Sequence, residues 1–273
     1  MFKQNPKTII NTDEDHTFNK PNNKQKFKKL TLQWVRDVKD TRDYIYPSTG
    51  VKVGNYVDLR SHCSPIENQG NLGSCTGQAI AGAIELINKR NKKPTDISRL
   101  FIYYYERLLL GTVNYDSGAY IRDGIKSVNR YGASLERLWP YIINKFRQQP
   151  VNEAIVDAAK RKVTRYERIL NHAGCLDALN NGYPIVIGFD VYSSFMNINH
   201  TGVMKYPNKR RERLLGGHAV LIVGYDLANQ RYIVRNSWGT SWGERGYFYM
   251  PFSVIQDTSM SSDFWIIKGV NNP

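Results

Sequence analysis

The sequence predicts an α+β fold with two subdomains, because patterns typical of helices come first and patterns typical of strands follow. Between residues 75 and 161 apolar residues recur at helical spacing, whereas after Pro184 the apolar runs are short and continuous, as in buried strands. Helices and strands that occupy separate parts of a chain favour an α+β architecture over an alternating one. No internal repeat is visible.

Length and composition agree with a globular protein. The 273 residues are 41% hydrophobic and 23% charged, which excludes wholesale disorder, collagen and coiled coil. No apolar run approaches the ~18 residues of a membrane span. The net charge of +14 makes a nucleic acid or an anionic surface a conceivable partner, but charge alone does not decide a fold.

Residues 1–55 are expected to form an N-terminal arm or a propeptide. The polar start, with the basic run Lys24–Lys29, cannot bury much apolar surface, so these lysines belong to a solvated tail or contact a polyanion. Trp34, Tyr44 and Tyr46 follow as anchors that could dock the segment on a body. The start has no apolar core of a secretory signal, so an intracellular location is expected rather than a lysosomal or secreted one.

The mainly helical part is expected over residues 56–165. Its first helix covers residues 75–90, because five apolar residues lie on one helical face: Ala79, Ile80, Ala83, Ile84 and Ile87. Further helices are predicted over 98–109, 119–130 and 153–161.

The β-rich part is expected over residues 166–273, after a short helix at 175–180. Its predicted strands cover residues 185–189, 218–225, 232–236 and 246–250. A cleft between two such subdomains is a favoured place for an active site.

Cys75 is the candidate nucleophile among three cysteines. A thiol at the start of a helix lies at the positive end of the helix dipole, which favours the nucleophilic thiolate. A buried structural cysteine is the alternative interpretation. Cys63 and Cys175 are either a disulfide pair or two buried free thiols.

His218 and Asn236 are the candidate partners of this thiol. A general base must lie within hydrogen-bond reach of the nucleophile in the fold, not in the sequence. The two residues are placed on adjacent predicted strands, which would bring them side by side, and the amide oxygen of Asn236 could orient the imidazole.

Cys75, His218 and Asn236 lie, in this order along the chain, in three sequence motifs. They are Gln69-Gly70-Asn71-Leu72-Gly73-Ser74-Cys75, His218-Ala219-Val220-Leu221-Ile222-Val223-Gly224-Tyr225 and the segment 236–247. With them the chain resembles the papain-like, cathepsin-type C1 cysteine peptidases, and especially their disulfide-poor bacterial and giant-DNA-virus members. The resemblance runs from about Tyr56 to Met250 and implies a papain-like fold with the active site between a helical and a β-rich half.

The resemblance also implies catalytic roles. Cys75 would attack the substrate carbonyl, His218 would form an ion pair with it and protonate the leaving amine, and Asn236 would orient the ring. The side chain of Gln69 and the backbone N–H of Cys75 would form the oxyanion hole. No metal or cofactor is expected.

Four further features follow from the resemblance. Trp238 would shield the contact between His218 and Asn236, and Trp242 would line the leaving-group side of the cleft. Gly118-Ala119 stands where the family has a Gly-Gly that pairs with the substrate backbone, and the added methyl could narrow the cleft. Thr76 and Leu72 replace the usual tryptophan and disulfide cysteine.

The function predicted from the sequence is a cysteine endopeptidase that forms a thioester acyl-enzyme and is made as a zymogen. The N-terminal segment would lie in the cleft and be cut between about Tyr46 and Tyr56. An exopeptidase or isopeptidase with the same triad is an alternative, with the basic loop 209–213 as a carboxylate site. A polyanion-binding protein on the same scaffold is another. Virion packaging is expected if the source is a large DNA virus.

Overall fold

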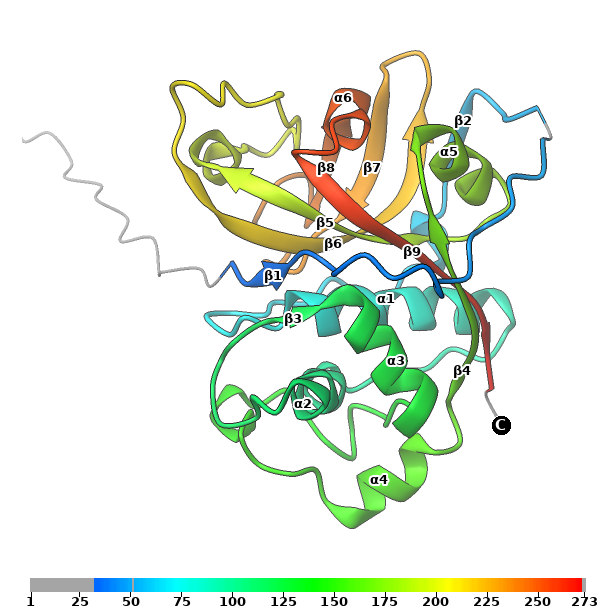
Figure 1. The fold of residues 1–273 in the computed structure, drawn as a ribbon, viewed down its shortest axis with the longest axis vertical. Coiled ribbons are helices and arrows are strands. Elements are labelled where there is room, and N and C mark those ends of the chain that lie inside the picture. The colour runs from blue at the N-terminus through cyan, green and yellow to red at the C-terminus, as the bar shows by residue number, and fades with distance from the viewer. Residues whose placement is uncertain (1–31, 51, 272–273) are drawn as a thin grey trace, which may run out of the picture.

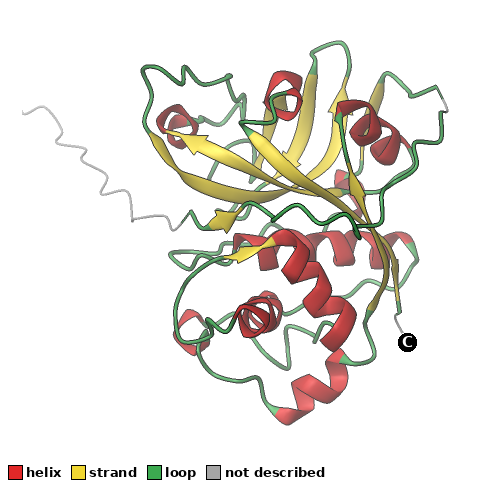
Figure 2. Cartoon of the chain, in the orientation of Figure 1, coloured by secondary structure: helices red, strands yellow, loops and turns green. Residues whose placement is uncertain are grey.

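Most of the helices lie in one half of a computed structural model and the large sheet lies in the other; the model describes residues 32–50 and 52–271 (Figures 1 and 2). The helices are α1 (Cys75–Arg90), α2 (Arg99–Leu110), α3 (Ile121–Tyr131), α4 (Asn152–Ala158), α5 (His172–Asn180) and α6 (Phe252–Gln256). The strands are β1 (Trp34–Val35), β2 (Tyr56–Asp58), β3 (Ala119–Tyr120), β4 (Val163–Ile169), β5 (Ile185–Tyr192), β6 (Leu214–Asp226), β7 (Arg231–Arg235), β8 (Tyr247–Pro251) and β9 (Ser261–Val270).

Seven strands form an antiparallel sheet in the order β4-β9-β5-β6-β7-β8, with β2 paired to β6. Helices α1 to α4 make up most of the other half, and α1 packs against β6 (Figure 1). The α+β prediction and the papain-like two-part architecture are therefore confirmed.

Two apolar cores bury the faces of the sheet. The face toward α1 joins Ile80 and Ile84 of the helix to Leu221 and Trp265 of the sheet. The opposite face packs on α5 and α6 and includes Phe189 and Phe248. Helix α1 is thus fixed by the sheet across the boundary between the halves, and its first residue is Cys75.

Several predicted elements match the structure closely, and five of the nine strands in the described residues were missed. The first helix begins and ends as predicted, whereas β4, β9 and the short strands β1, β2 and β3 were not predicted. Strand β4 is rich in charged residues and has no apolar run, whereas the apolar run Phe264–Ile267 of β9 was overlooked. Strands β1, β2 and β3 are only two or three residues long. The division at residue 165 falls inside β4, and β2, placed with the helices, pairs with the sheet.

The three cysteines are free and buried, so Cys63 and Cys175 are two separate thiols and not a disulfide. The basic run Lys24–Lys29 lies outside the described residues. No helix in the described ranges has both the length and the apolarity needed to cross a membrane.

Candidate active site

Cys75 is the first residue of α1 and is fully buried. The backbone N–H groups of Ala219, Gln33 and Thr76 hydrogen-bond to its sulfur. Ala219 follows His218 in β6, so the contact brings the predicted base next to the predicted nucleophile.

His218 and Asn236 form the predicted pair, with His218 Nε2 2.8 Å from Asn236 Oδ1. Both side chains are buried. The other ring nitrogen, Nδ1, is buried and has no hydrogen-bond partner among the described residues, so it is free to take the proton of a thiol. The Asn236 oxygen thus fixes the Nε2–H tautomer of the imidazole.

Trp238 lies over this imidazole, with the ring centroids 4.8 Å apart and the planes 25° from parallel. Trp242 meets Trp238 edge-on at 5.1 Å. These contacts put Trp238 in the shielding position predicted for it and Trp242 beside it.

Burial keeps the pair neutral in this state. It raises the pKa of the Cys75 thiol to about 11, although the three backbone N–H groups lower it and Glu106 raises it further. Burial lowers the pKa of His218 to about 4, while the Asn236 hydrogen bond opposes this shift. The ion pair predicted from the sequence is therefore disfavoured while the thiol is covered.

Gln69 is held by contacts at both ends of its side-chain amide. Its Nε2 donates to the Leu72 carbonyl at 2.9 Å, and its Oε1 accepts from Ser237 Oγ at 2.6 Å. Its backbone N–H donates to the Ser237 carbonyl at 2.8 Å. Ser237 follows Asn236, so one segment orients both the imidazole and the predicted oxyanion-hole amide; sequence reasoning missed this role of Ser237.

The loop before Cys75 is fixed by an acidic residue that sequence reasoning also missed. Asp116 accepts the Gly73 N–H at 3.0 Å and the hydroxyl of Tyr103. That hydroxyl in turn accepts the Gly118 N–H at 3.2 Å. The network ties the nucleophile loop to the predicted substrate-pairing residues.

Thr76, the departure next to the nucleophile, donates to the carboxyl group of Glu106 at 2.5 Å. Glu106 is fully buried in α2, and burial raises its pKa to about 8. A tryptophan at position 76 would have no hydroxyl for this contact.

The cleft beside Cys75 is filled by the chain's own residues 32–37. Strand β1 pairs in parallel with β3 through Trp34 and Ala119, so Ala119 carries main-chain pairing (Figure 1). Gly118, with φ +68°, has no room for a side chain because a methyl group there would lie 1.8 Å from the Gln33 carbonyl oxygen.

A buried charge cluster holds the same segment beyond the cleft. Arg122 of α3 binds Asp43 at 2.6 Å, and Arg168 of β4 binds Asp43 at 3.1 Å and Asp263 at 3.0 Å. Asp37 accepts the indole N–H of Trp265 at 2.8 Å. The segment is thus tied to both halves of the molecule.

Two of the three predicted apolar anchors are buried. Trp34 is 5% exposed and Tyr46 7%, and the Tyr46 hydroxyl donates to Asp177 at 2.7 Å. The prediction for Tyr44 was wrong: its side chain is 74% exposed. Its backbone carbonyl instead accepts the N–H of Arg168 at 2.7 Å, so main-chain pairing fixes it.

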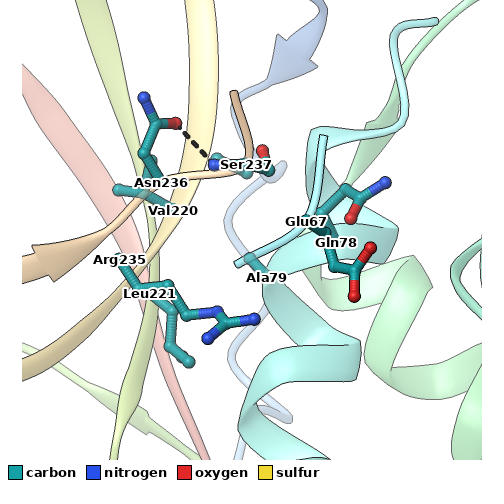
Figure 3. A pocket seen from close by; sticks show the side chains of 9 residues that line it. Glu67, Gln78, Ala79, Val220, Leu221, Arg235, Asn236 and Ser237 are labelled. Atoms are coloured by element: carbon teal, nitrogen blue, oxygen red, sulfur yellow. Dashed lines mark hydrogen bonds between the residues drawn. The ribbon is translucent and has the colours of Figure 1, made fainter. Parts of the chain in front are cut away.

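Near Asn236, the helical half and the β-rich half of the molecule are closely packed. A cavity of about 10 Å³ there is lined by Asn236 and Ser237 on one side and by Gln78 and Ala79 of α1 on the other. Figure 3 shows these residues, with the Asn236 amide directed away from α1. The Ser237 N–H donates to Asn236 Oδ1 at 2.9 Å, the bond drawn there. The amide oxygen that orients His218 is therefore itself fixed by a main-chain donor.

The family model described as "Papain family cysteine protease" matches residues 53–267. The chain belongs to this family. The matched region contains the three motifs and the pair His218–Asn236, and it begins after the segment that fills the cleft. The recognition made from the motifs is confirmed.

The papain-family relatives include viral and animal proteins. An uncharacterised peptidase C1-like protein of Acanthamoeba polyphaga mimivirus is 44% identical over 219 residues, covering 76% of this chain and 70% of that protein. Mouse cathepsin K is 29% identical over 215 residues, covering 76% of this chain and 63% of cathepsin K. The chain thus spans less than two thirds of the length of cathepsin K.

Solved structures agree with this assignment. Xylellain, a cysteine protease from Xylella fastidiosa, superposes with a TM-score of 0.83 at 38% identity, covering 88% of this chain and 97% of that one. Procathepsin L 3 of Tenebrio molitor superposes with a TM-score of 0.69 at 20% identity, covering 82% of this chain and 72% of that one, and shows the shared fold.

Proposed function

We propose that this papain-family chain is a cysteine endopeptidase with Cys75, His218 and Asn236 as its catalytic residues. The observation that carries the proposal is the hydrogen bond between His218 and Asn236, which leaves His218 Nδ1 without a partner among the described residues. The next residue in the chain, Ala219, contacts the Cys75 sulfur through its backbone N–H. A cysteine with only a structural role would not require a hydrogen-bonded His–Asn pair beside it.

The reaction follows from these positions. His218 Nδ1 takes the thiol proton, the Cys75 sulfur attacks the peptide carbonyl, and the imidazolium then protonates the leaving amine. A water, deprotonated by the same ring, hydrolyses the thioester and regenerates the thiol. The Gln69 amide and the Cys75 backbone N–H stabilise the oxyanion formed in both steps.

Segment 32–50 is proposed to keep the full-length chain latent. Gln33 and Trp34 lie where a substrate would reach Cys75, and the covered thiol has the pKa of a poor nucleophile. Release admits water, which removes the burial that disfavours the ion pair. The proposed processing region is 46–56, because Ser48, Thr49, Gly50 and Lys52 are exposed there.

The test compares the full-length chain with a variant starting near Gly54 on a small peptide substrate. We expect the shortened chain to hydrolyse the peptide and the full-length chain to do so only after its segment is cut. Both rates should vanish with a thiol-directed epoxide bound at Cys75. Equal initial rates from both folded proteins contradict latency, whereas no thiol-dependent hydrolysis by either contradicts the peptidase.

Gln69→Ala is expected to lower kcat about 10²- to 10³-fold with little change in KM, because one oxyanion donor acts mainly in the transition state. Gln149→Ala, at an exposed position, is the matched control and should leave kcat unchanged. Steady-state kinetics on one peptide substrate checks both. A Gln69→Ala enzyme with normal kcat would remove this residue from the oxyanion hole.

Acid is expected to hold the segment in place more tightly through Asp37. Burial, and then the nearby Asp263, raise the pKa of Asp37 from 3.8 to about 6. The docked segment therefore binds a proton more readily than the released one. This contribution, at most about 3 kcal/mol, is fully present below about pH 3.8 and is lost as pH rises through about 6.

Hydrogen exchange of the segment in full-length protein with Cys75→Ala and His218→Gln, corrected for intrinsic rates, measures this effect. His218 is replaced because burial in the docked state lowers its pKa to about 4, so it would bind a proton more readily after release and oppose Asp37. Protection of residues 33–38 should increase from pH 7.5 to pH 5. Asp37→Asn should remove that pH dependence. Greater protection at pH 7.5 than at pH 5 would show that other groups dominate the release.

A virion or cell-interior location is likewise a proposal, supported by the similarity to a mimivirus protein. Detection of the chain in purified particles by mass spectrometry tests it.

A further inference from the structure

The loop 69–74 before Cys75 determines where the two proposed oxyanion donors lie. It begins with Gln69 and leads into the Cys75 backbone N–H, and its Leu72 carbonyl accepts Gln69 Nε2 at 2.9 Å. Two of its six residues are glycines, which leave the backbone free to move unless other groups hold it. Because a displacement of about 1 Å can cost about 10²-fold in rate, the position of this loop matters for the reaction.

Asp116 holds this loop through its main chain. The two carboxylate oxygens accept the Gly73 N–H at 3.0 and 3.2 Å, and one of them also accepts the hydroxyl of Tyr103. Hydrogen bonds to a carboxylate are roughly twice as strong as those between neutral groups. Asp116 belongs to the loop 111–118 at the edge of the cleft, so the contact joins the nucleophile loop to that edge.

Tyr103 extends the connection to the main chain that pairs in the cleft. Its hydroxyl donates to Asp116 and accepts the Gly118 N–H at 3.2 Å. Gly118 precedes Ala119, whose main chain pairs with Trp34 of the docked segment, so we expect a substrate strand to pair at the same place. The Tyr103 side chain is fully buried in α2, which gives its hydroxyl a fixed position.

Arg107, also in α2, fixes the loop 111–118 from below its main chain. Its guanidinium donates to the Val113 carbonyl at 2.8 Å and to the Tyr115 carbonyl at 3.0 Å. The same group lies over the Tyr103 ring, 4.1 Å from the ring centroid. Helix α2 therefore holds the phenol, and the loop that carries the carboxylate, in one fixed arrangement.

We propose that Asp116 and Tyr103 are positioning residues that couple substrate pairing at Gly118 to the oxyanion hole at Cys75. The proposal rests on the proposed peptidase function. Asp116 keeps the nucleophile loop at the distance from the edge of the cleft that the reaction needs, and Tyr103 keeps the pairing main chain aligned with that loop. Neither side chain touches the reacting atoms, and each acts through the backbone that it holds.

Steady-state kinetics of the full-length chain, after its segment has been released, separates the two roles. Titration with a thiol-directed epoxide gives the concentration of competent sites, so that kcat refers to folded enzyme only. Asp116→Ala should lower kcat about 10- to 10²-fold, because the oxyanion donors lose their fixed place. Tyr103→Phe should leave kcat within about twofold and raise KM roughly three- to tenfold, because only the pairing main chain loses its contact.

Three further variants serve as conservative replacement and controls. Asp116→Asn keeps an oxygen in place of the one that accepts both the Gly73 N–H and the Tyr103 hydroxyl, so it should recover most of the lost kcat. Asn114→Ala, at an exposed position of the same loop, and Tyr104→Phe, on the same helix, are the matched controls. Both should leave kcat and KM unchanged.

The double variant tests whether the two side chains act together. Because Asp116 orients the Tyr103 hydroxyl, Tyr103→Phe should raise KM less than about twofold once Asp116→Ala is present. Single effects on KM that simply multiply in the double variant show two independent contacts, which overturns the coupling and the proposal.

The outcomes distinguish a failure of this inference from a failure of the peptidase. Normal kcat in Asp116→Ala, or normal KM in Tyr103→Phe, overturns the inference and leaves the peptidase standing. Fewer titrated sites with an unchanged kcat per site show a purely structural role, which also overturns it. Absence of thiol-dependent hydrolysis by the unchanged chain overturns the peptidase, and with it any role in positioning.

Discussion

Cys75→Ala is expected to abolish peptide hydrolysis, with a loss in kcat on the order of 10⁶-fold, as for removal of the nucleophile from a triad. The two other thiols are not expected to replace it, because Cys63 donates to the Leu59 carbonyl and Cys175 is buried in the core on the other face of the sheet. The fold should survive, since the change removes one buried sulfur, at a cost of about 1 kcal/mol.

Cys63→Ala and Cys175→Ala are the matched controls, because both thiols are also buried and free. Burial raises the pKa of each, so neither is expected to react readily. Activity should be near normal in both, and an epoxide label should map to Cys75 after release of the segment. Full activity in Cys75→Ala, or equal labelling of the three thiols, would overturn the assignment.

The residues proposed to be catalytic were predictable from the sequence because each lies in a short motif tied to a local structure. Cys75 opens a helix whose apolar face is plain in the sequence. His218 and Asn236 lie on strands whose apolar runs are equally plain. The observed hydrogen bond between them needed only that β6 and β7 be adjacent, which consecutive antiparallel strands usually are.

The supporting contacts were less predictable because they join residues far apart in the chain. The Ser237 hydroxyl meets Gln69 only once the two halves are packed together. Likewise the parallel pairing of β1 with β3 brings Trp34 to Ala119, and a two-residue strand carries no periodic signal. Burial of Trp34 could be expected from its size, but not its position against Gly188.

The bulge in β9 shows the same limit. The pairing with β5 moves three residues along β9 for two along β5, and Asp263 has a φ of +61°. A bulge of this kind redirects side chains near a site. Asp263 accepts the Asp37 N–H at 2.8 Å, and Ser262 lies opposite Gly188 of β5. Residues 261–263 have no apolar pattern that would distinguish them from a loop, although the run Phe264–Ile267 after them is typical of a buried strand.

Asp43→Ala is expected to activate the full-length chain before any cleavage. Asp43 is the partner of Arg122 and Arg168, and the Arg122 and Asp43 side chains are only 8% and 7% exposed. Removing one member of a buried ion pair costs about 3–5 kcal/mol, because the remaining charge stays buried without its partner. Since release of the segment returns both arginines to water, the cost falls on the docked state alone. The docked-to-released ratio should therefore drop about 10²- to 10⁴-fold.

Asp40→Ala is the matched control from the same segment. Among the described residues Asp40 forms its salt bridge with Arg42, whose side chain is 86% exposed, and such an exposed pair contributes little because solvent screens it. The measurement is the initial rate on a small peptide substrate, with gel analysis to show that the segment is still uncut. Asp43→Ala should raise this rate well above that of the unchanged chain, and Asp40→Ala should not. If Asp43→Ala stays as slow as the unchanged chain, the charge cluster does not hold the segment, and the latent state must rest on the contacts of Gln33 and Trp34 in the cleft.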